Sequence, residues 1–355
     1  MSLPKVHILG AGSIGSLLAY NLAKAKVFTP VLMLRDAARQ KDFKKRGSTV
    51  YYCGNDTPLS QFGIRHNYNT EPLLTGEGIQ IESMSPDQIK EPLSHIIVTT
   101  KAQSTLSALF NYKEAIDCNT SMLFLQNGLG LREQMEDKVW RYDDPNKPHL
   151  FFGVTTHGAH RLPSPFYEYR HAGQGQIDMA IGPSTMLEEN PFEQILQTSP
   201  TLGCQNTMPY PELLLKQCQK LVVNACVNPL TALMDCNNGQ LLDSYASGTI
   251  INTVVFESSV ILREYLLDTI GHQINPALIS SALKPQRLNE LVNKVLELTH
   301  GNSSSMREDV RNNRVTEIRY INKFLMDMGN KYKKPVTANL MLYNLVNAQQ
   351  DFNKF

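Results

Sequence analysis

The sequence lacks several features that mark specialised classes of protein. Its 34 Lys and Arg residues nearly balance 33 Asp and Glu residues, and the net charge of +1 comes without blocks of Lys or Arg. A nucleic acid is therefore not expected as the main partner. We also expect no membrane partner, because no apolar run reaches membrane-spanning length. The N-terminus has no signal-peptide pattern, which predicts a cytoplasmic protein and leaves a mitochondrial location open.

Cysteine is scarce, and its spacing does not suggest a disulfide framework. The chain has 6 cysteines, which show no C-x-x-C spacing and lie mostly in apolar or helical contexts. They are predicted to be reduced thiols. Four histidines fall in one region without an acid or cysteine at ligand spacing: His149, His157, His160 and His171. We interpret them as structural or loop histidines and expect no metal site.

The pattern of predicted elements changes in the second half of the chain. Strand-like and helix-like segments alternate in the first half, whereas only helix-like segments follow from about residue 211. We therefore predict an α/β Rossmann-type dinucleotide-binding domain at 1–207 and an all-helical substrate domain at 208–355, with the substrate cleft between them. The helices of the second domain are expected at 211–234, 244–270, 286–300, 305–328 and 336–350.

A glycine-rich turn near the N-terminus predicts a dinucleotide site. A short apolar strand, the pattern G-x-G-x-x-G and a helix of small apolar residues follow one another from Val6 onward. Gly10 permits the tight turn, Gly12 allows the backbone to approach a pyrophosphate, and Gly15 allows close packing of helix on strand. The residues expected to contact the cofactor are Gly10, Ala11, Gly12, Ser13, Ile14 and Gly15.

The ends of three later strands carry further candidate cofactor residues. Arg35 ends the second strand, where an NADP site offers arginine to the 2′-phosphate, although Asp36 is a competing NAD signal one residue later. The sequence favours NADP. Lys101 and Asn127 end two buried-type strands, where a nucleotide is expected to lie. Asn127-Gly128 is also an ordinary turn, and Lys101 also suits a solvated strand end.

The run K-L-V-V-N-A-C-V-N-P-L-T-A predicts a polar line on a buried helix. Lys220, Asn224 and Asn228 are four residues apart and share one face, while apolar residues cover the remainder. Buried amine and amide groups need polar partners, which a ligand would supply. The alternative is an Asn ladder bonded to neighbouring helices.

A second polar group in the helical half lies between Gly301 and Asn322. Its serines suggest a helix start, with Ser305-x-x-Glu308 as a capping box. A helix start with a serine hydroxyl also suits a carboxylate. Glu317 follows about three turns later beside the apolar stripe, and the alternative for it is a surface ion pair with Arg314 or Arg319.

The sequence as a whole resembles the ketopantoate reductase (2-dehydropantoate 2-reductase) family in its fungal form. The resemblance spans nearly the full length. It rests on G-x-G-x-x-G at 10–15, V-T-T-K ending at Lys101, Q-N-G at 126–128, T-T-H-G-A at 155–159, K-L-V-V-N-A-C-V-N-P-L-T-A at 220–232, N-G at 238–239, and S-S-M-R-x-D with T-E-I-x-Y-I-N at 304–322. One departure is visible, because Gln103 follows the strand-end lysine by two residues rather than three. The region 42–90 is also expanded.

The resemblance implies NADPH-dependent reduction of ketopantoate, a small 2-keto acid, to (R)-pantoate. By position, it makes Lys220 the proton donor and Glu317 the glutamate that completes the ternary site. Its implied substrate residues are Asn127, Asn224, Asn228, Asn238 and Ser305. Its implied cofactor residues are Arg35, Lys101, Asn127, Ala159 and Glu317. Two alternatives remain: a reductase of another 2-keto acid or ketone, and an inactive NADP-binding regulatory protein. A homodimer is left open.

Overall fold

The structure is a computed structural model that describes residues 3–53, 76–141, 144–162 and 167–352. The chain divides into two compact units. The first unit comprises 1–126 and 135–210, and the second comprises 127–134 and 211–355. The segment 127–134, which is expected from the sequence to belong to the first domain, groups with the helical unit. We describe each unit separately.

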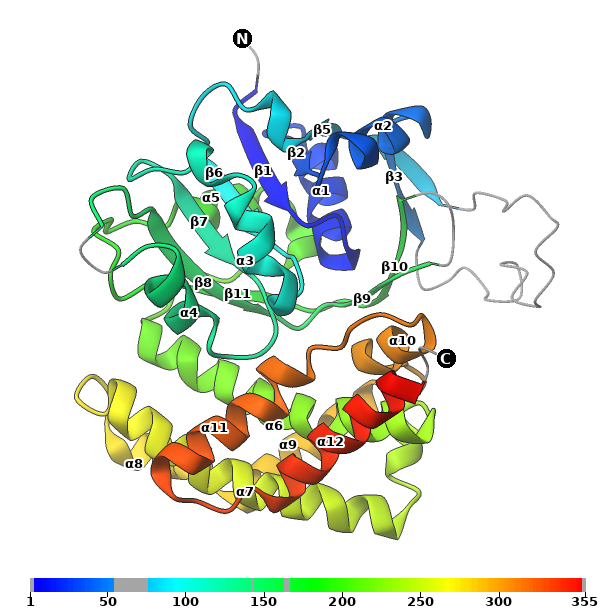
Figure 1. Cartoon of the computed structure of the whole chain (residues 1–355), viewed down its shortest axis with the longest axis vertical. Helices are drawn as coiled ribbons and strands as arrows, with labels where there is room; N and C mark the ends of the chain where they lie inside the picture. Colours follow the sequence, from blue (N-terminus) through cyan, green and yellow to red (C-terminus); the bar gives the residue numbers. More distant parts are fainter. Residues whose placement is uncertain (1–2, 54–75, 142–143, 163–166, 353–355) are drawn as a thin grey trace, which may run out of the picture. The chain divides into compact units, whose positions relative to one another are not determined.

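A seven-stranded sheet forms the centre of the first unit, in the order β11-β8-β7-β6-β1-β2-β5 (Figure 1). All neighbouring strands are parallel except β11 and β8. Progression along the chain reverses direction at β1, as in a Rossmann-type fold. The predicted fold of this half is confirmed. The strands are β1 (Lys5–Leu9), β2 (Thr29–Met33), β5 (Glu82–Met84), β6 (His95–Val98), β7 (Ser121–Phe124), β8 (His149–Thr155) and β11 (Ile177–Ile181).

A smaller sheet completes the first unit. Its order is β4-β3-β10-β9, with β3 and β10 parallel and the outer pairs antiparallel. The strands are β3 (Thr49–Cys53), β4 (Glu77–Gln80), β9 (Gly158–Arg161) and β10 (Tyr167–Gly173). Part of the expanded 42–90 region thus forms β3, β4 and β5, whereas 54–75 lies outside the described residues.

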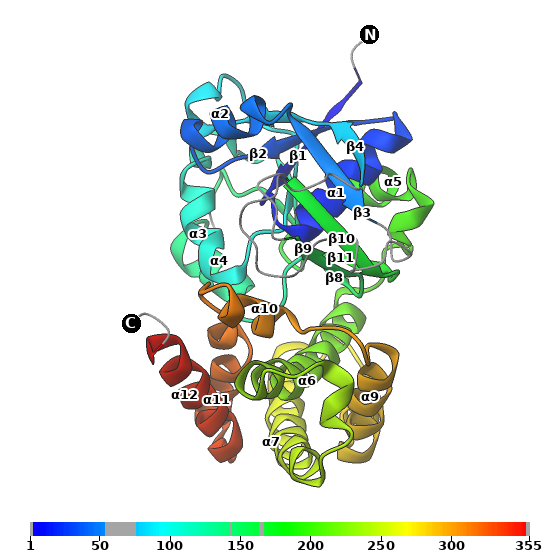
Figure 2. The ribbon, with the colours of Figure 1, turned by 90° about the vertical axis from the view of Figure 1, so that its right-hand side faces the viewer.

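Helices cover both faces of the large sheet. Helix α1 (Ser13–Ala25) contacts strands of both sheets and buries Leu17, Leu18 and Leu22 in the core. Figure 2 shows α1 and α5 (Pro191–Gln197) on one side of the sheet and α3 (Ala102–Phe110) on the other. The other helices of this part are α2 (Ala37–Lys45) and α4 (Leu131–Lys138), and α4 crosses the boundary between the units.

The second unit is all-helical, as predicted. Helix α7 (Tyr245–Ile270) contacts α8, α9, α11 and α12. Within the described part of the chain, α7 alone is long and apolar enough to cross a bilayer, but half of its apolar window is buried, as in a core helix. The remaining helices are α6 (Tyr210–Met234), α8 (Pro276–Ala282), α9 (Pro285–Leu298), α10 (Ser305–Arg311), α11 (Asn322–Tyr332) and α12 (Thr337–Phe352). Helix α8 lies outside the helices expected from the sequence.

The predicted helix at 305–328 is wrong, because the chain breaks it into α10, a 3-10 turn η6 (Ile318–Tyr320) and α11. Asn313 has a positive φ of 50° at the end of α10. The N–H of Asn313 bonds to the carbonyl of Val310, and that of Arg314 bonds to the carbonyl of Asp309. This is the Schellman arrangement, in which asparagine can replace glycine. The helix therefore ends before Glu317, which lies in the connection to α11.

Candidate active site

The glycine turn and the strand-end lysine lie at adjacent loops of the first unit. Gly10 has a φ of 118°, and a Cβ there would lie 2.7 Å from the backbone nitrogen of Thr100. The Thr99 hydroxyl donates to the carbonyl of Gly10 at 2.9 Å. These contacts place the loop after β1 against the loop after β6, which ends at Lys101. Both loops leave the carboxyl ends of neighbouring parallel strands, where open α/β sheets bind ligands.

Glycine is needed for different reasons at the three positions of the motif. A Cβ on Gly15 would lie 1.8 Å from the carbonyl oxygen of Gly10, so only glycine permits this packing. A Cβ on Gly12 would meet nothing within 4 Å. Helix α1 has no side-chain cap and no acid in its first turn. The start of α1 therefore offers N–H groups and open space beside Gly12, as a dinucleotide pyrophosphate requires.

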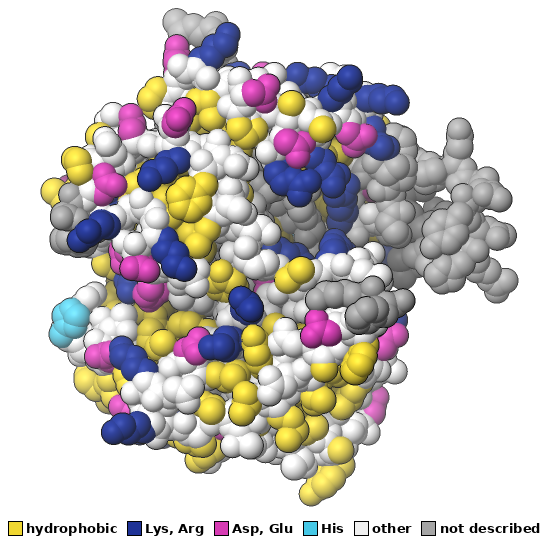
Figure 3. Space-filling model, in the orientation of Figure 1, with side chains coloured by type: hydrophobic (Ala, Val, Ile, Leu, Met, Phe, Trp, Pro, Cys, Tyr) yellow, Lys and Arg dark blue, Asp and Glu magenta, His cyan; other side chains and the backbone are white. Residues whose placement is uncertain are grey.

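Arg35 and Asp36 follow β2, next to β1 in the sheet. Both carboxylate oxygens of Asp36 have partners, because one accepts from the N–H of Arg39 at 2.7 Å and the other lies 3.2 Å from Nε of Arg35. Asp36 thereby caps α2. These interactions lower the pKa of Asp36, mainly through the N–H of Arg39. The Arg35 side chain is 73% exposed. Figure 3 shows Lys and Arg side chains gathered around the position of α2.

Lys101 and Ala159 occupy different parts of the first unit. Lys101 occupies the N-cap position of α3 without a side-chain capping bond, and it is partly buried. Gln126, the first residue of the Q-N-G motif, donates to the carbonyl of Thr100 at 2.5 Å, which fixes the loop before Lys101. Ala159 lies on β9 in the smaller sheet, opposite His171. Because β9 contacts α1, its strand lies beside the helix that follows the glycine turn.

In the second unit, α6 carries the predicted polar line. The helix is buried nearly all round between Leu221 and Ala232, where Asn228 is buried and Asn224 is partly exposed, and Lys220 just before this stretch is partly exposed. Among the described residues, neither Asn224 nor Asn228 has a side-chain hydrogen-bond partner. The alternative of an Asn ladder bonded to neighbouring helices is therefore not what the structure contains. The two amides remain available to a polar ligand.

Lys220 and Glu317 interact electrostatically within this unit. Burial lowers the pKa of Lys220 to about 8, and the negative charge of Glu317 opposes that decrease. Glu317 is only 7% exposed. Its alternative interpretation as a surface ion pair is therefore wrong, and Arg314 instead lies 3.8 Å from Asp309. An amine with this pKa can hold a proton near neutral pH and release it without a large cost.

Asn127, in the segment after β7, contacts Glu317. Its Nδ2 lies 3.4 Å from a carboxylate oxygen of Glu317. The next residues dock on η6, because the N–H of Leu129 bonds to the carbonyl of Tyr320 at 3.1 Å. Gly128 has a φ of 82°, and a Cβ there would lie 2.5 Å from the same carbonyl oxygen. The glycine of Q-N-G is thus needed for the close approach that brings Asn127 to Glu317.

The serine cluster forms a cap, but one residue earlier than predicted. Ser304, not Ser305, is the N-cap of α10, and its hydroxyl accepts from the N–H of Arg307 at 3.1 Å. The predicted capping box is therefore wrong, and Glu308 instead accepts from the Ser303 hydroxyl at 2.5 Å. Ser305 is exposed at the first helical position. Within the described chain its hydroxyl has no hydrogen-bond partner.

Thr231, which is not among the site residues expected from the sequence, connects this cluster to α6. Its hydroxyl donates to Ser304 Oγ at 2.7 Å, and both residues are buried. Thr231 is three residues after Asn228 and so continues the polar face of the helix. That spacing was the available signal. Through this contact the Ser304–Ser305 turn is held beside the Asn228 end of the polar line.

Asn238 lies in a second 3-10 turn, η5 (Asn238–Leu241). Its Nδ2 donates to the hydroxyl of Thr299 at 2.9 Å, and its N–H bonds to the carbonyl of Asn302 at 3.0 Å. The residue is buried, yet its Oδ1 has no hydrogen-bond partner in the described chain. A buried amide oxygen without a partner is unfavourable, and a hydroxyl donor from a ligand would satisfy it.

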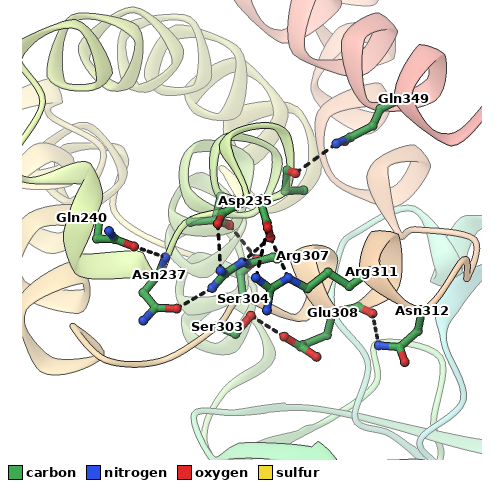
Figure 4. A network of polar contacts seen from close by, with 12 residues as sticks. Asp235, Asn237, Gln240, Ser303, Ser304, Arg307, Glu308, Arg311, Asn312 and Gln349 are labelled. Carbon is green, nitrogen blue, oxygen red and sulfur yellow. Dashed lines mark hydrogen bonds and ion pairs between the residues drawn. The ribbon is translucent and has the colours of Figure 1, made fainter. Parts of the chain in front are cut away.

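A network of polar contacts around Asp235 holds α10, the helix that begins at the serine turn (Figure 4). Arg307 and Arg311 bind the Asp235 carboxylate at 2.9 and 2.6 Å and lower its pKa to about 2. A pocket adjoins this network. It is lined by Ala232, Asp235, Val310, Arg311, Asn313 and Gln349. None of these is a predicted site residue, and the network links the end of α6 to α10.

The histidines and cysteines occur in structural contexts. Nδ1 of His157 lies 3.0 Å from Nε2 of His171, and both side chains are buried. Burial lowers the pKa of each. Over the described residues, no group of three or more His, Cys, Asp or Glu side chains could hold a metal ion. The cysteines, all of them described, form no disulfide: Cys53, Cys118, Cys204, Cys218, Cys226 and Cys236.

Both units match sequence families. The family described as Ketopantoate reductase PanE/ApbA matches residues 6–184, and Ketopantoate reductase PanE/ApbA C terminal matches residues 212–350. The chain belongs to the ketopantoate reductase family. This confirms the resemblance on which the residue assignments depend. The assignments of individual side chains stay predictions.

Relatives of this family match the chain over most of its length. The probable 2-dehydropantoate 2-reductase of Schizosaccharomyces pombe is 31% identical, over 98% of this chain and 97% of its own length. The 2-dehydropantoate 2-reductase of Saccharomyces cerevisiae is 28% identical, over 91% and 88% respectively. These fungal relatives support the fungal form of the resemblance.

Solved structures share the fold at lower identity. A PanE/ApbA family ketopantoate reductase from Ralstonia eutropha JMP134 has a TM-score of 0.72 at 17% identity and covers 99% of this chain and 100% of that chain. A D-mandelate dehydrogenase with NADH and anilino(oxo)acetate has a TM-score of 0.71 at 20% identity, with the same coverage. The fold of the family therefore occurs in dehydrogenases of more than one name.

Proposed function

We propose that the protein is an NADPH-dependent 2-dehydropantoate 2-reductase, which reduces ketopantoate to (R)-pantoate in pantothenate and coenzyme A biosynthesis. Membership of the ketopantoate reductase family supports the reaction class. The observation that carries the proposal is the pairing of Lys220, whose pKa is about 8, with the buried Glu317. A lysine of this kind suits the donation of a proton to a developing alkoxide at neutral pH.

When bound, the reduced nicotinamide supplies a hydride to the C2 ketone of the substrate. Lys220 stabilises the negative charge that develops on the carbonyl oxygen and gives it a proton. Glu317 keeps Lys220 protonated to a higher pH, and Asn127 orients the Glu317 carboxylate. The remaining side chains bind the substrate: Ser305 its carboxylate, and Asn224, Asn228 and Asn238 its polar oxygens. The amides of Asn224 and Asn228 and the Oδ1 of Asn238, which have no partner among the described residues, fit this role.

For the cofactor, we propose NADPH rather than NADH. Support comes from Arg35, whose exposed guanidinium suits a 2′-phosphate, and from Asp36, whose oxygens are already bonded to Arg39 and Arg35. An acid that selects NAD would need an oxygen directed at the ribose 2′-hydroxyl. Gly10 to Gly15 would hold the pyrophosphate, with Lys101 and Ala159 as further contacts. We also propose a cytoplasmic location.

Two other functions would also be compatible with the family and the fold. The first is reduction of another 2-keto acid or ketone, because the fold alone does not identify the tail of the substrate. The second is an inactive NADP-binding regulatory protein. A homodimer stays a prediction; a ketopantoate reductase from Staphylococcus aureus with a TM-score of 0.66 is described as dimeric. Size-exclusion chromatography with light scattering measures this state directly.

The test is oxidation of NADPH by purified protein with ketopantoate, beside pyruvate, 2-ketoisovalerate and an NADH control. We expect turnover with ketopantoate and NADPH, and a kcat about 100-fold lower or more for Lys220→Ala with the NADPH Kd unchanged. The matched control is Lys216→Ala, one turn earlier on α6 and exposed, which should keep wild-type kcat. Turnover with another keto acid alone would select the first alternative. Tight NADPH binding without reduction of any keto acid would select the second.

A further inference from the structure

Pro229 interrupts the hydrogen bonding of α6 directly beside a predicted substrate residue. It lies inside the helix, immediately after Asn228. Proline has no N–H, and its ring collides with the carbonyl four residues earlier, so the Ala225 carbonyl loses its helical partner. Ala225 is fully buried. A buried carbonyl needs a donor, and this one lies between Asn224 and Asn228.

Asn322 supplies that donor from α11. Its Nδ2 donates to the carbonyl of Ala225 at 3.1 Å and to Oδ1 of Asn339 at 3.0 Å. Both asparagine side chains are fully buried. Asn322 begins α11 and follows Glu317 by five residues. The same short segment therefore carries the carboxylate that acts on Lys220 and the amide that satisfies the carbonyl released by Pro229.

A buried carboxylate holds the Asn322 side chain in place. Oε2 of Glu257, on α7, accepts from Nδ2 of Asn339 at 2.8 Å. The same carboxylate accepts from the backbone N–H groups of Ala338 and Asn339 at 2.9 and 3.1 Å. These N–H groups lie in the first turn of α12, where a negative charge is favourable. Asn339 is thus fixed by two bonds to Glu257, from its backbone N–H and from Nδ2, which leaves its Oδ1 directed at Asn322.

We propose that Asn322 is a positioning residue for the reaction. Its bond to Ala225 fixes α6 at the turn that Pro229 interrupts, and so sets the alignment of the Lys220–Glu317 pair with the amides of Asn224 and Asn228. This inference rests on the proposed function. It explains the asparagine of T-E-I-x-Y-I-N, which is otherwise too deeply buried to be a ligand contact, and the proline of V-N-P-L.

The geometry predicts a specific rescue. Pro229→Ala restores an N–H at position 229, which can bond to the Ala225 carbonyl within the helix. Asn322 is then no longer needed for that carbonyl. We expect Asn322→Ala to lower kcat about 10- to 100-fold by misalignment, with the NADPH Kd unchanged. In the Pro229→Ala background, the same substitution should lower kcat by no more than about 3-fold, because the two residues share one interaction.

Ser259→Ala is the matched control, since it removes a different buried bond from a side chain to a carbonyl, that of Leu283, and keeps the bond between Asn322 and Ala225. It should lower the Tm while kcat and the pH profile stay at wild-type values. If Asn322→Ala does not fold, Asn322→Ser, whose hydroxyl is too short to reach Ala225, replaces it. An equal loss of kcat in the presence and absence of Pro229, with an unchanged pH profile, means that Asn322 is only structural and overturns the inference.

A second measurement separates this inference from the proposed function. If the wild-type protein reduces no keto acid, the proposed function fails. The positioning of Lys220 is then measured by NMR titration of lysine-labelled protein. The inference predicts that Asn322→Ala shifts the pKa of Lys220 by changing its separation from Glu317, and that Pro229→Ala reverses the shift. A Lys220 pKa that is the same in all three variants and the wild type overturns it without reference to activity.

Discussion

The side-chain amide of Asn127 lies 3.4 Å from the carboxylate of Glu317, and 190 residues separate the two in the chain. This contact explains why 127–134 belongs to the helical unit, although it follows a strand of the Rossmann-type sheet. The docking of Gly128 and Leu129 on η6 holds the contact in place. The amide orients the carboxylate, and the carboxylate sets the charge environment of Lys220.

The first prediction concerns the pH dependence of keto acid reduction. The pKa of Lys220 is about 8, lowered by burial and supported by the negative charge of Glu317. A proton donor acts only in its protonated form, so kcat should be level below this pKa and fall as pH rises through it. Glu317→Gln removes the negative charge, which lowers the pKa of Lys220 further. The descending limb of the kcat profile should therefore move to lower pH.

The control for this profile is Asp327→Asn, which removes an exposed acid of α11 in the same unit. Its descending limb should coincide with that of the wild type. The two variants separate a specific effect of Glu317 from a general change in net charge. A Glu317→Gln enzyme whose descending limb stays near pH 8 contradicts the assigned coupling.

Arg35→Ala and Asp36→Ala should affect different properties. The first should weaken the preference for NADPH, and the second should lower the thermal stability. Loss of a charge-assisted contact to the 2′-phosphate should raise the KM for NADPH about 10- to 100-fold, with little change for NADH. Asp36→Ala removes the cap of α2 and should lower the Tm, while the preference for NADPH persists. Steady-state kinetics with both cofactors and thermal unfolding of both variants decide. A preference for NADPH that survives Arg35→Ala excludes Arg35 as the phosphate contact.

Gly12→Ala and Gly15→Ala test the two kinds of glycine in the fingerprint. A Cβ on Gly12 meets nothing within 4 Å in the protein, so this variant should keep its Tm and lose NADPH affinity through collision with the pyrophosphate. A Cβ on Gly15 would lie 1.8 Å from the carbonyl of Gly10, so that variant should unfold at a lower temperature. Calorimetry and cofactor titration measure both. Equal affinity of Gly12→Ala and wild type would place the pyrophosphate elsewhere.

Local patterns account for much of what the sequence predicts correctly. The glycine turn, the parallel strands and the long helices α6 and α7 depend on periodicity and backbone conformation within short windows. The break of the 305–328 helix also had a local signal, the pair Asn312-Asn313 that ends α10. The helix prediction missed it because apolar spacing continues past that pair.

Other features depend on contacts that no short window contains. Segment 127–134 joins the helical unit because Gly128 and Leu129 dock on Tyr320. The bond from Asn322 to Ala225 requires α11 to lie beside α6, which is a property of the tertiary fold. A proline in a helix indicates an unpaired carbonyl, but it does not identify the donor. Tertiary packing therefore decides which polar residues act together.

The last prediction separates two adjacent serines, which the sequence alone did not distinguish. Ser304 caps α10 and accepts a bond from Thr231, whereas Ser305 is exposed at the first helical position. Ser304→Ala should lower the free energy of unfolding by about 1 kcal/mol, as for other N-cap serines. Ser305→Ala should change it by less than about 0.5 kcal/mol, as for other exposed positions.

The effects on activity should have the opposite order, with Ser305→Ala more damaging than Ser304→Ala. If the Ser305 hydroxyl binds the substrate carboxylate, Ser305→Ala should raise the KM for the keto acid about 10-fold, which corresponds to the loss of one bond to a charged group. The KM for NADPH should not change, because Ser305 is not among the residues assigned to the cofactor. Urea unfolding and keto acid kinetics on the two variants give the four values needed. A KM increase confined to Ser304→Ala would assign the carboxylate contact to the cap rather than to Ser305.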